Sequence, residues 1–564
     1  MKEKVEILIK RAIGREDGFE VTVPEQKGFG HFSTNAALKL AKELGKNPMV
    51  LAEDWATAIR KEAPKEMIAD VSVIKPGFIN LKLAPDFVKS EGEKIYAERK
   101  NFGRTKIGRG KKIIVEYSDP NIAKQMHVGH IRSTIIGDAI ANIFEFSGYK
   151  VLRWNYLGDW GTQFGKLIAA YKLWGDKKVV EQEPIVELQK LYVKFHDEMK
   201  EKPELEGRGQ EEFKKLEQGD RENRKLWEWF KKESLKEFQK IYKILGVDFD
   251  IWIGEAFYEK KLKLLVDDLI KRGVAKRSEG ALVVPLDDRG LPPGLIQKSD
   301  GASLYLTRDI ANLEYRREKY RPEEILYVVG NEQSLHFEQL FAIKNILGWS
   351  DIKTEHIKFG TILGEKGKRF ATREGRVIIL SDLIEKIIGL AKEVVAKKNP
   401  QLSEKEKERV ARAVGIGALK YGDLKENRHS DIVFDWERML DFSGNSAPYL
   451  QYTYARIQGI KNKSGRAAKP KFEFLKNEVE DDLILKIAQF PEAVTKARRT
   501  FLTSELTEYL FELANLVNRF YETVPVGREN DRDKKNARLG LIDLAGTVLE
   551  SGLGLLGIEV LDKI

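Results

Sequence analysis

The chain has 564 residues, of which 42% are hydrophobic and 33% charged, which is enough apolar material for several cores in a multidomain globular protein. It contains no cysteine, which excludes disulfides, cysteine nucleophiles and thiolate metal sites, and with seven histidines we expect no metal site. The net charge of +10 is compatible with a polyanionic partner, and because the sequence has no apolar run that resembles a membrane span or signal peptide, we expect a cytoplasmic protein without membrane contact.

Residues 1–105 are predicted to form a separate α+β domain. Helical patterning is clearest at 36–42, and strand-like runs follow at 71–74 and 77–83. A basic connector with several glycines, residues 103–112, then precedes a change of pattern. We therefore place the first domain boundary near residue 105.

The next segment is predicted to form a doubly wound α/β domain. The apolar run at 113–117 suits a buried parallel strand, a helical pattern follows at 131–146, and a strand-like run comes at 149–154. Strand, helix and strand in this order form the unit from which open parallel sheets are built. The predicted fold class of this part is therefore α/β.

Two helical regions complete the predicted organisation. Residues 176–245 are rich in Glu, Lys and Leu, with breaks at Pro184 and Pro203, and are predicted to be charged helices inserted into the sheet domain. From Glu404 onward strand patterns are almost absent and helical runs dominate. We therefore divide the chain into domains at 1–105, 106–400 and 401–564.

The most informative stretch, residues 116–134, joins the first predicted strand of the sheet to the following helix. It places His127 and His130 at the start of that helix, with Gly129 between them and Lys124 just before. A helix N-terminus beyond a parallel strand attracts phosphate, two imidazoles on one face can donate to phosphoryl oxygens, and a glycine lets a flat base approach the backbone. The segment therefore predicts a nucleotide phosphate site, although a bare His-x-Gly-His also arises by chance.

The wider pattern, Ser-x-Pro-Asn-x-x-Lys-x-x-His-x-Gly-His-x-Arg-Ser, resembles the HIGH signature of class I aminoacyl-tRNA synthetases in the extended form of arginyl-tRNA synthetases. Further blocks resemble the same family in the same order, at 158–165, 304–311, 327–337 and 446–456. The resemblance implies a Rossmann-type catalytic domain, an N-terminal domain that touches the tRNA elbow, and a C-terminal helical bundle that binds the anticodon.

The resemblance also implies the reaction. L-arginine is activated with ATP and its Mg²⁺ to arginyl-adenylate, and arginine is then transferred to the 3′-terminal adenosine of tRNA(Arg). No permanently bound cofactor is implied, and a monomer is our default expectation. By motif position, His127, His130 and Lys124 are the expected catalytic residues, and these three also bind ATP together with Gly129.

The second class I signature, usually written KMSKS, is degenerate in this chain. The corresponding segment, residues 364–375, lacks the usual lysine-serine-lysine ending, as in many members of the family. In such members the lysine before the HIGH histidines is thought to supply the missing charge, and that position is Lys124. Arg373 is our expected further ATP contact, with Lys368 as the open alternative.

An arginine pocket needs carboxylates to pair with the guanidinium of the substrate. Tyr305 and Asp309 lie four apart on a predicted helix, where they share one side, and Glu116 ends the first strand near the same crevice. The alternative for the helical pair is an ordinary amphipathic helix with an acid facing solvent. Matching the family's motifs gives the expected arginine contacts as Glu116, Ser118, Asn121, Tyr305, Asp309 and Gln333. Glu255 is a further acid that a helix-capping role explains equally well, so it is left out.

Contacts with tRNA are expected at Phe78, Asn80 and Tyr449. Phe78 and Asn80 could stack on and hydrogen-bond an unpaired base, or could be a core residue and a turn cap. Tyr449 belongs to an aromatic and basic run that could face RNA or pack helices.

Two rival functions remain open at this point. Another class I synthetase, or a smaller nucleotidyltransferase, would share the histidine signature, although the latter would lack the long helical C-terminus. A non-catalytic tRNA-binding paralogue is the rival from another class, and the retained histidines, Lys124 and acidic residues argue against it.

Overall fold

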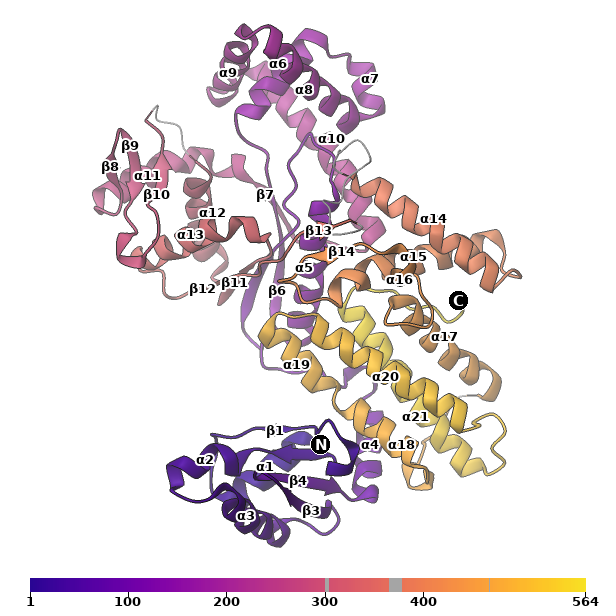
Figure 1. Ribbon diagram of the computed structural model, residues 1–564. Helices are drawn as coiled ribbons and strands as arrows, with labels where there is room; N and C mark the ends of the chain where they lie inside the picture. Colours follow the sequence, from indigo (N-terminus) through magenta and orange to yellow (C-terminus); the bar gives the residue numbers. More distant parts are fainter. Residues whose placement is uncertain (300–303, 365–377, 466) are drawn as a thin grey trace.

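The computed structural model describes residues 1–299, 304–364, 378–465 and 467–564. A five-stranded, entirely parallel sheet lies at the centre of the molecule, in the strand order β12-β11-β5-β6-β7 (Figure 1). Its strands are β5 (Lys112–Glu116), β6 (Lys150–Leu157), β7 (Ile251–Gly254), β11 (Glu324–Tyr327) and β12 (Lys353–His356). The chain adds β6 and β7 on one side of β5 and returns to the other side with β11. Ligands of such sheets bind beyond the strand ends where this reversal occurs, which is between β5 and β11.

The helix that follows β5 is α5 (Val128–Phe146), and nearly all of its residues are buried. Together with β5 and β6 it forms the predicted strand–helix–strand unit. The helix begins three residues before the predicted start, because His127 caps its first turn. The α/β fold class, with an additional α+β domain before the sheet and an all-α bundle after it, is confirmed.

The N-terminal part is built on a four-stranded antiparallel sheet in the order β1-β2-β4-β3, with helices on one face. Its elements are α1 (Lys2–Ile13), β1 (Val21–Thr22), β2 (Phe32–Thr34), α2 (Ala36–Leu44), α3 (Pro48–Glu62), β3 (Ile68–Ile74), β4 (Phe78–Leu83) and α4 (Pro85–Glu98). Alternate residues of β4, such as Ile79 and Leu81, are fully buried against the helices. Figure 1 shows this part beside the C-terminal helices and at the opposite end of the molecule from the helical insertion.

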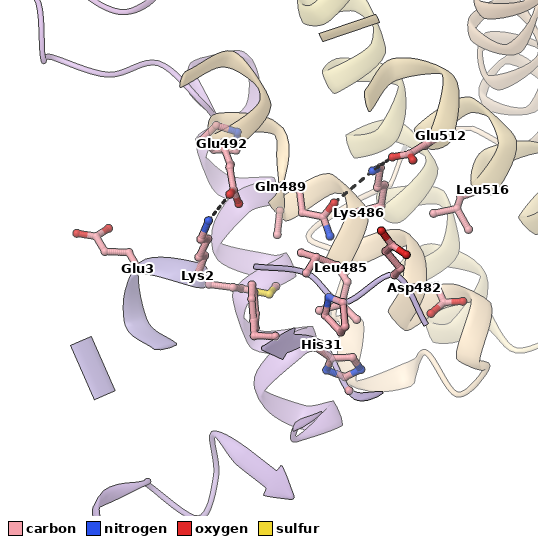
Figure 2. Close-up of a pocket in the computed structure, with 18 residues that line it drawn as sticks. Lys2, Glu3, His31, Asp482, Leu485, Lys486, Gln489, Glu492, Glu512 and Leu516 are labelled. Atoms are coloured by element: carbon pink, nitrogen blue, oxygen red, sulfur yellow. Dashed lines mark hydrogen bonds and ion pairs between the residues drawn. The ribbon is translucent and has the colours of Figure 1, made fainter. Parts of the chain in front are cut away.

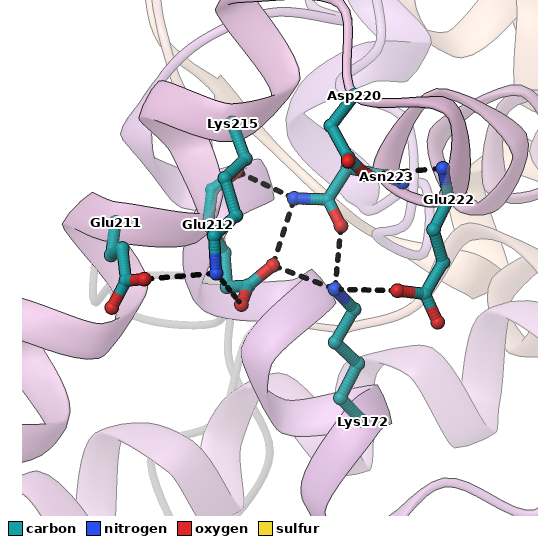
Figure 3. A network of polar contacts seen from close by, with 7 residues as sticks. All are labelled: Lys172, Glu211, Glu212, Lys215, Asp220, Glu222 and Asn223. Atoms are coloured by element: carbon teal, nitrogen blue, oxygen red, sulfur yellow. Dashed lines mark hydrogen bonds and ion pairs between the residues drawn. The ribbon is translucent and has the colours of Figure 1, made fainter.

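The chain between β6 and β7 is helical, and Figure 1 shows it beyond one end of the sheet. Its helices are α6 (Thr162–Trp174), α7 (Lys177–Gln182), α8 (Pro184–Glu201), α9 (Glu204–Glu217) and α10 (Arg221–Leu245). A polar network ties α6, α9 and α10 together (Figure 3): Lys172 Nζ donates to Glu212 Oε2 at 2.8 Å and to Asn223 Oδ1 at 2.7 Å. Asn223 in turn donates to the backbone oxygen of Glu212 at 2.8 Å. These bonds satisfy polar groups that are largely buried and fix the helices relative to one another.

The remaining part of the sheet domain carries a small antiparallel sheet, β8-β9-β10, and the helices that precede and follow β11. These elements are α11 (Glu259–Lys271), β8 (Lys276–Ser278), β9 (Ala281–Val284), β10 (Gly294–Gln297), α12 (Tyr305–Tyr320) and α13 (Ser334–Ile346). They share one hydrophobic core with part of the parallel sheet, which includes Ile114 and Trp154.

The C-terminal part is a helical bundle that packs against α5. Its helices are α14 (Leu380–Lys398), α15 (Glu404–Leu424), α16 (Trp436–Met439), α17 (Ala447–Ser464), α18 (Glu478–Ala488), α19 (Phe490–Thr500), α20 (Ser504–Thr523) and α21 (Arg532–Leu555). The strands β13 (Ile362–Leu363) and β14 (Ile432–Val433) pair in parallel beside it. In the described part of the chain, no helix combines the length and the apolar character needed to cross a membrane.

Candidate active site

The two predicted histidines form a compact turn at the N-terminus of α5. The Gly129 N–H donates to His127 Nδ1 at 3.1 Å, and the His127 N–H donates to His130 Nδ1 at 3.1 Å. The two ring centroids are 4.0 Å apart. Because each Nδ1 accepts a backbone hydrogen, we assign the ring hydrogen of the neutral imidazoles to Nε2, where it is a donor.

The charge state of His130 follows from its surroundings. Burial, together with the neighbouring His127, lowers the pKa of His130 to about 3. His130 is therefore neutral at physiological pH, and it can donate from Nε2 to an anion without carrying a charge. The positive end of the α5 helix dipole lies at the same place.

Gly129 is required by the turn itself. A Cβ atom at this position would lie 2.8 Å from His127 Cε1 and 2.9 Å from His127 Nδ1. Lys124, which was expected beside the histidines, lies with its Nζ 5.4 Å from the ring centroid of Tyr192 on α8. The lysine therefore contacts the helical insertion, on the side of the loop that precedes the histidines. Arg373 and Lys368 fall outside the described residues.

The loop between β5 and α5 is held by buried hydroxyl groups. Ser118, which was expected to contact arginine, shares a hydrogen bond of 2.6 Å with the Tyr242 hydroxyl and accepts one from Thr134 Oγ1 at 2.9 Å. These bonds occupy Ser118 within the protein, so its side chain shapes the loop. Asn121 is exposed and lies over Gly158, where a Cβ atom would come within 2.1 Å of Asn121 Oδ1. The structure thus joins Asn121 to the Gly158–Gly165 block.

Glu116 is buried at the end of β5 and forms an ion pair with Arg316 of α12. The guanidinium carbon of Arg316 also lies 4.2 Å from the ring centroid of Trp154. A contact between Glu116 and the substrate guanidinium stays a prediction, and in the structure an arginine of the chain pairs with this carboxylate. The sequence did not reveal this, because Arg316 is 200 residues away along the chain.

Asp309 is the predicted acid that the structure presents to the crevice. His336 Nε2 lies 2.6 Å from Asp309 Oδ2. Burial alone would lower the pKa of His336, but the hydrogen bond and the negative charge of Asp309 outweigh it, so the pKa is raised. Tyr305, one turn before Asp309, is 62% exposed, and Gln333 is exposed just before α13. These three predicted residues come from the helices on either side of β11.

Glu255, which sequence reasoning set aside, belongs to the same group of acids. It directly follows β7, and its Oε2 is buried without a hydrogen-bond partner among the described residues. Burial raises the pKa of Glu255 to about 8, against the effect of Arg308, and Asp309 and Asp159 raise it further. Its place at the carboxyl end of a parallel strand, the same as that of Glu116, is a signal that could have identified it.

Tyr156 was also missed. Its hydroxyl is buried and has no hydrogen-bond partner among the described residues, and burial together with the charges of Asp309 and Glu255 raises its pKa well above the usual value. Asp159 lies two residues after the end of β6. Its carboxylate accepts a hydrogen bond from the Ala256 N–H at 2.9 Å and so fixes the turn that carries Glu255. The acidic cluster, defined here as Glu116, Asp119, Glu255 and Asp309, thus surrounds unsatisfied polar atoms and suits a cation with several donors.

No metal centre is evident at this site. Within the described ranges, no three His, Asp or Glu residues lie close enough together to hold a metal ion.

The residues expected to contact tRNA lie outside the central parallel sheet. Phe78 is half-buried on β4, while Asn80 is only 2% exposed, and neither polar atom of its amide has a partner in the described part of the chain. Asn80 does not cap a turn, because it lies within β4 and is paired there with Ser33 and Ser72 of the neighbouring strands. Tyr449 is half-buried and bonds to Asn515 and Asn518 of α20, as expected for a residue that packs helices.

A cavity of about 610 Å³ lies between the N-terminal part and the bundle (Figure 2). Its walls carry charges of both signs, and Lys2 pairs with Glu492 across it. Neither Phe78 nor Asn80 lines it. The cavity is therefore separate from both the sheet site and the expected elbow contact.

Three family models match consecutive parts of the chain. The model described as "tRNA synthetases class I (R), catalytic domain" matches residues 93–436. "Arginyl tRNA synthetase N terminal domain" matches residues 1–83, and "DALR anticodon binding domain" matches residues 450–564.

Proteins that share one name are similar to this chain over nearly the whole length of both chains. An arginine–tRNA ligase of Clostridium acetobutylicum is 41% identical over 96% of this chain and 95% of its own, and one of Halothermothrix orenii is 39% identical over 100% and 99%. The crystal structure of arginyl-tRNA synthetase from Plasmodium falciparum superposes with a TM-score of 0.84 at 27% identity, covering 100% of this chain and 99% of that one. The Thermus thermophilus arginyl-tRNA synthetase has a TM-score of 0.83 at 23% identity over both complete chains, a likeness in fold.

Proposed function

The chain belongs to the class I arginyl-tRNA synthetase family, and on that premise we propose that it activates L-arginine with ATP and transfers it to tRNA(Arg) at the carboxyl end of the parallel sheet. The observation that carries the proposal is that a turn suited to an anion and a cluster suited to a cation lie at the same end of the parallel sheet. A neutral histidine turn suited to phosphate follows β5, and an acidic cluster with unsatisfied polar atoms lies beyond β5, β7 and α12.

In the first step, a carboxylate oxygen of arginine attacks the α-phosphorus of ATP, and the bond to the β-phosphate breaks, so that arginyl-adenylate and pyrophosphate form. No protein nucleophile is needed, so the protein contributes alignment and charge stabilisation. We assign phosphate-oxygen donation to Nε2 of His127 and His130, with Gly129 allowing the turn. Lys124, Arg373 and the Mg²⁺ that accompanies ATP are proposed to supply positive charge, which neutral histidines do not.

The guanidinium of arginine is assigned to Asp309 and Glu255. Asp309 uses one oxygen for His336 and has a second for the substrate, and Glu255 has a buried oxygen without a partner among the described residues. Five guanidinium donors match such a set of acceptors. Tyr305 and Gln333 are proposed to border the substrate, and Asn121 to hold its α-amino and carboxyl groups. Glu116, paired with Arg316, is proposed to support the pocket from behind.

In the second step, a hydroxyl of the terminal ribose attacks the carbonyl carbon of the adenylate, an ester forms, and adenosine monophosphate leaves. The tRNA is proposed to lie along the bundle and the N-terminal part. On the bundle, Tyr452 and Tyr521 are exposed and flank Arg456, whose guanidinium carbon lies 4.9 and 4.6 Å from their ring centroids. Exposed aromatic rings beside an arginine suit unstacked bases.

Three further assignments are proposed with the function. The domains are placed at 1–105, 106–400 and 401–564, with the helical insertion at about 176–245. A cytoplasmic location is proposed because aminoacyl-tRNA is consumed by translation. A monomer is proposed because one chain contains every residue assigned above.

The function is tested by ATP–pyrophosphate exchange with each of the twenty amino acids, with and without total tRNA. Exchange with arginine alone is the expected result, and dependence on tRNA would mean that the site is completed only in the complex. Exchange with another amino acid would overturn the assignment of the pocket. Binding of tRNA without any exchange would favour a non-catalytic paralogue.

A further inference from the structure

Arg132 lies on α5, two residues beyond His130, and its side chain is almost completely buried. Its Nε–H donates to both carboxylate oxygens of Asp423, at 3.1 and 3.2 Å. Its Nη1 donates to the backbone oxygens of Gly360 at 2.7 Å and Ser430 at 3.0 Å. One guanidinium therefore binds three separate segments of the chain.

Each of these segments has a distinct place in the fold. Gly360 precedes β13, which leads toward the segment of the second signature. Asp423 lies in the last turn of α15, the second helix of the bundle, and Ser430 lies in the loop between α15 and β14. The segment before β13 and the loop between α15 and β14 are also joined directly, because the Gly360 N–H donates to the Arg428 backbone oxygen at 2.9 Å. Arg132 thus connects α5 both to this segment and to this loop.

The histidine turn makes a second connection on the other side of residues 365–377. The Val128 N–H donates to the Ile378 oxygen at 3.0 Å, and the Leu380 N–H donates to the Met126 oxygen at 2.9 Å. The described residues that precede and follow the second signature are therefore both bonded to residues 126–132 at the start of α5. The guanidinium of Arg132 provides the bond on the preceding side.

The chemistry of the Arg132–Asp423 pair favours a geometric role over a stabilising one. Burying two charges costs free energy that their attraction only partly offsets, so an apolar pair would hold two helices together as well. An apolar pair could not bond two backbone oxygens at fixed distances. The planar guanidinium offers several donors in fixed directions, whereas a lysine ammonium at this place would offer one compact charge whose donors rotate.

The residues on either side of Asp423 in the chain are bonded to other parts of the bundle. The Tyr421 hydroxyl donates to Asn445 Oδ1 at 2.6 Å, just before α17, and lies 3.1 Å from the Thr507 backbone oxygen in α20. Thr503 Oγ1 donates to the Leu424 oxygen at 2.8 Å. The end of α15 is therefore bonded to the residue before the N-cap of α17 and to the start of α20, the helices that carry Tyr452, Arg456 and Tyr521.

We propose that Arg132, held in place by Asp423, is a positioning residue for the activation step. It sets the position of the histidine turn relative to the strand that leads to the second phosphate-binding signature, and through Asp423 it makes the bundle part of the framework of the adenylation site. The inference rests on the proposed function, because it assumes that the histidine turn binds ATP.

The test compares three single variants of the full-length protein in arginine-dependent ATP–pyrophosphate exchange with tRNA present. Arg132→Lys keeps the charge but loses the set of directed donors, and Asp423→Asn keeps the shape but loses the charge. The control is Glu480→Gln, which alters the equally buried Arg538–Glu480 pair, 2.7 Å apart inside the bundle. Thermal unfolding is followed for all, and kinetics are measured well below the lowest unfolding temperature.

We expect the kcat of Arg132→Lys to fall by about 10- to 100-fold and that of Asp423→Asn by about 10-fold, with the KM values for ATP and arginine within about threefold of wild type. Glu480→Gln should keep its kcat even where its unfolding temperature falls. The proposal is overturned if Arg132→Lys and Asp423→Asn both keep wild-type kcat, or if only their KM values rise. It is also overturned if Glu480→Gln loses as much kcat as they do. A wild-type protein that shows no exchange with arginine would instead refute the proposed function, whatever the variants do.

Discussion

The histidine turn and the acidic cluster lie at the same end of one sheet, but they are built in different ways. The turn consists of four successive residues, His127 to His130, joined by hydrogen bonds from backbone N–H groups to the two imidazoles. The acidic cluster takes its members from three distant parts of the chain: Glu116 with Asp119, then Glu255, and then Asp309. The difference teaches that the residues of a proposed phosphate site can all come from one short segment. The residues of a proposed pocket for an organic cation come together only when several strands of the sheet have assembled.

The largest expected effect is the loss of a donor from the turn. His130→Asn keeps an acceptor for the His127 N–H but removes the Nε2 donor, so we expect kcat for exchange to fall by about 100-fold with the KM for arginine little changed. The matched control is His31→Asn, because His31 Nδ1 likewise accepts a backbone hydrogen, from Leu83 at 3.1 Å. A rise in arginine KM without loss of kcat would break the distinction between the two regions.

The acidic cluster should respond in the opposite kinetic parameter. Asp309→Asn removes a charged hydrogen bond to the guanidinium, so we expect the KM for arginine to rise by about 10- to 100-fold while the KM for ATP stays the same. Steady-state exchange kinetics with each substrate varied measure this. Asp351→Asn is the control, since Asp351 pairs with Arg317 on the surface at 2.9 Å. Unchanged arginine KM in Asp309→Asn would remove Asp309 from the pocket.

A smaller effect should follow from filling the space inside the turn. Gly129→Ala places a methyl group 2.8 Å from His127 Cε1, so the ring must move, and we expect kcat to fall by about 10-fold. Alanine is favoured over glycine within a helix by about 1 kcal/mol, so a loss of stability would not account for the result. Gly389→Ala in α14, which meets no atom within 4 Å, is the control for the exchange assay. Full activity of Gly129→Ala would show that the position of the His127 ring is unimportant.

The smallest expected effect concerns pH and sharpens the comparison, because His130 stays neutral over the range in which Glu255 titrates. Burial raises the pKa of Glu255 to about 8, so arginine binding should favour its ionised form, and kcat/KM for arginine should rise by about threefold to tenfold between pH 6.5 and 8.5. Glu255→Gln should lower kcat/KM and flatten this profile. A wild-type profile that is already flat would contradict the role of Glu255.

Stability provides an independent check of the same group. The folded protein with its raised Glu255 pKa binds more protons than the unfolded chain between pH 4.5 and about 8, so this residue makes the free energy of unfolding fall as pH rises through that window. Urea unfolding of wild type and Glu255→Gln at several pH values measures the difference in slope. The two proteins should diverge most above pH 8.

Much of the sheet site could be anticipated from local sequence. The apolar run at 113–117, the helix after it and the histidine spacing depend on neighbours in sequence, so the pattern predicts β5, α5 and the turn. The helix that carries Tyr305 and Asp309 was predicted from the spacing of the two residues, while their contact with arginine stays a prediction. The pairing of Glu116 with Arg316, the occupied hydroxyl of Ser118 and the burial of Asn80 were not, because each depends on side chains from other elements.

The sequence by itself therefore determined the family, the order of the three parts and the histidine turn, since motifs and periodicity act over a few residues. Only the tertiary structure decided which acids face the crevice and which are neutralised within the protein, because long-range packing sets burial and therefore pKa. It also decided that Arg132, an ordinary residue of the signature when read along the chain, binds a bundle helix and two backbone oxygens. Contacts between residues hundreds of positions apart leave no local pattern, and their physical meaning appears only once the sheet and the bundle have come together.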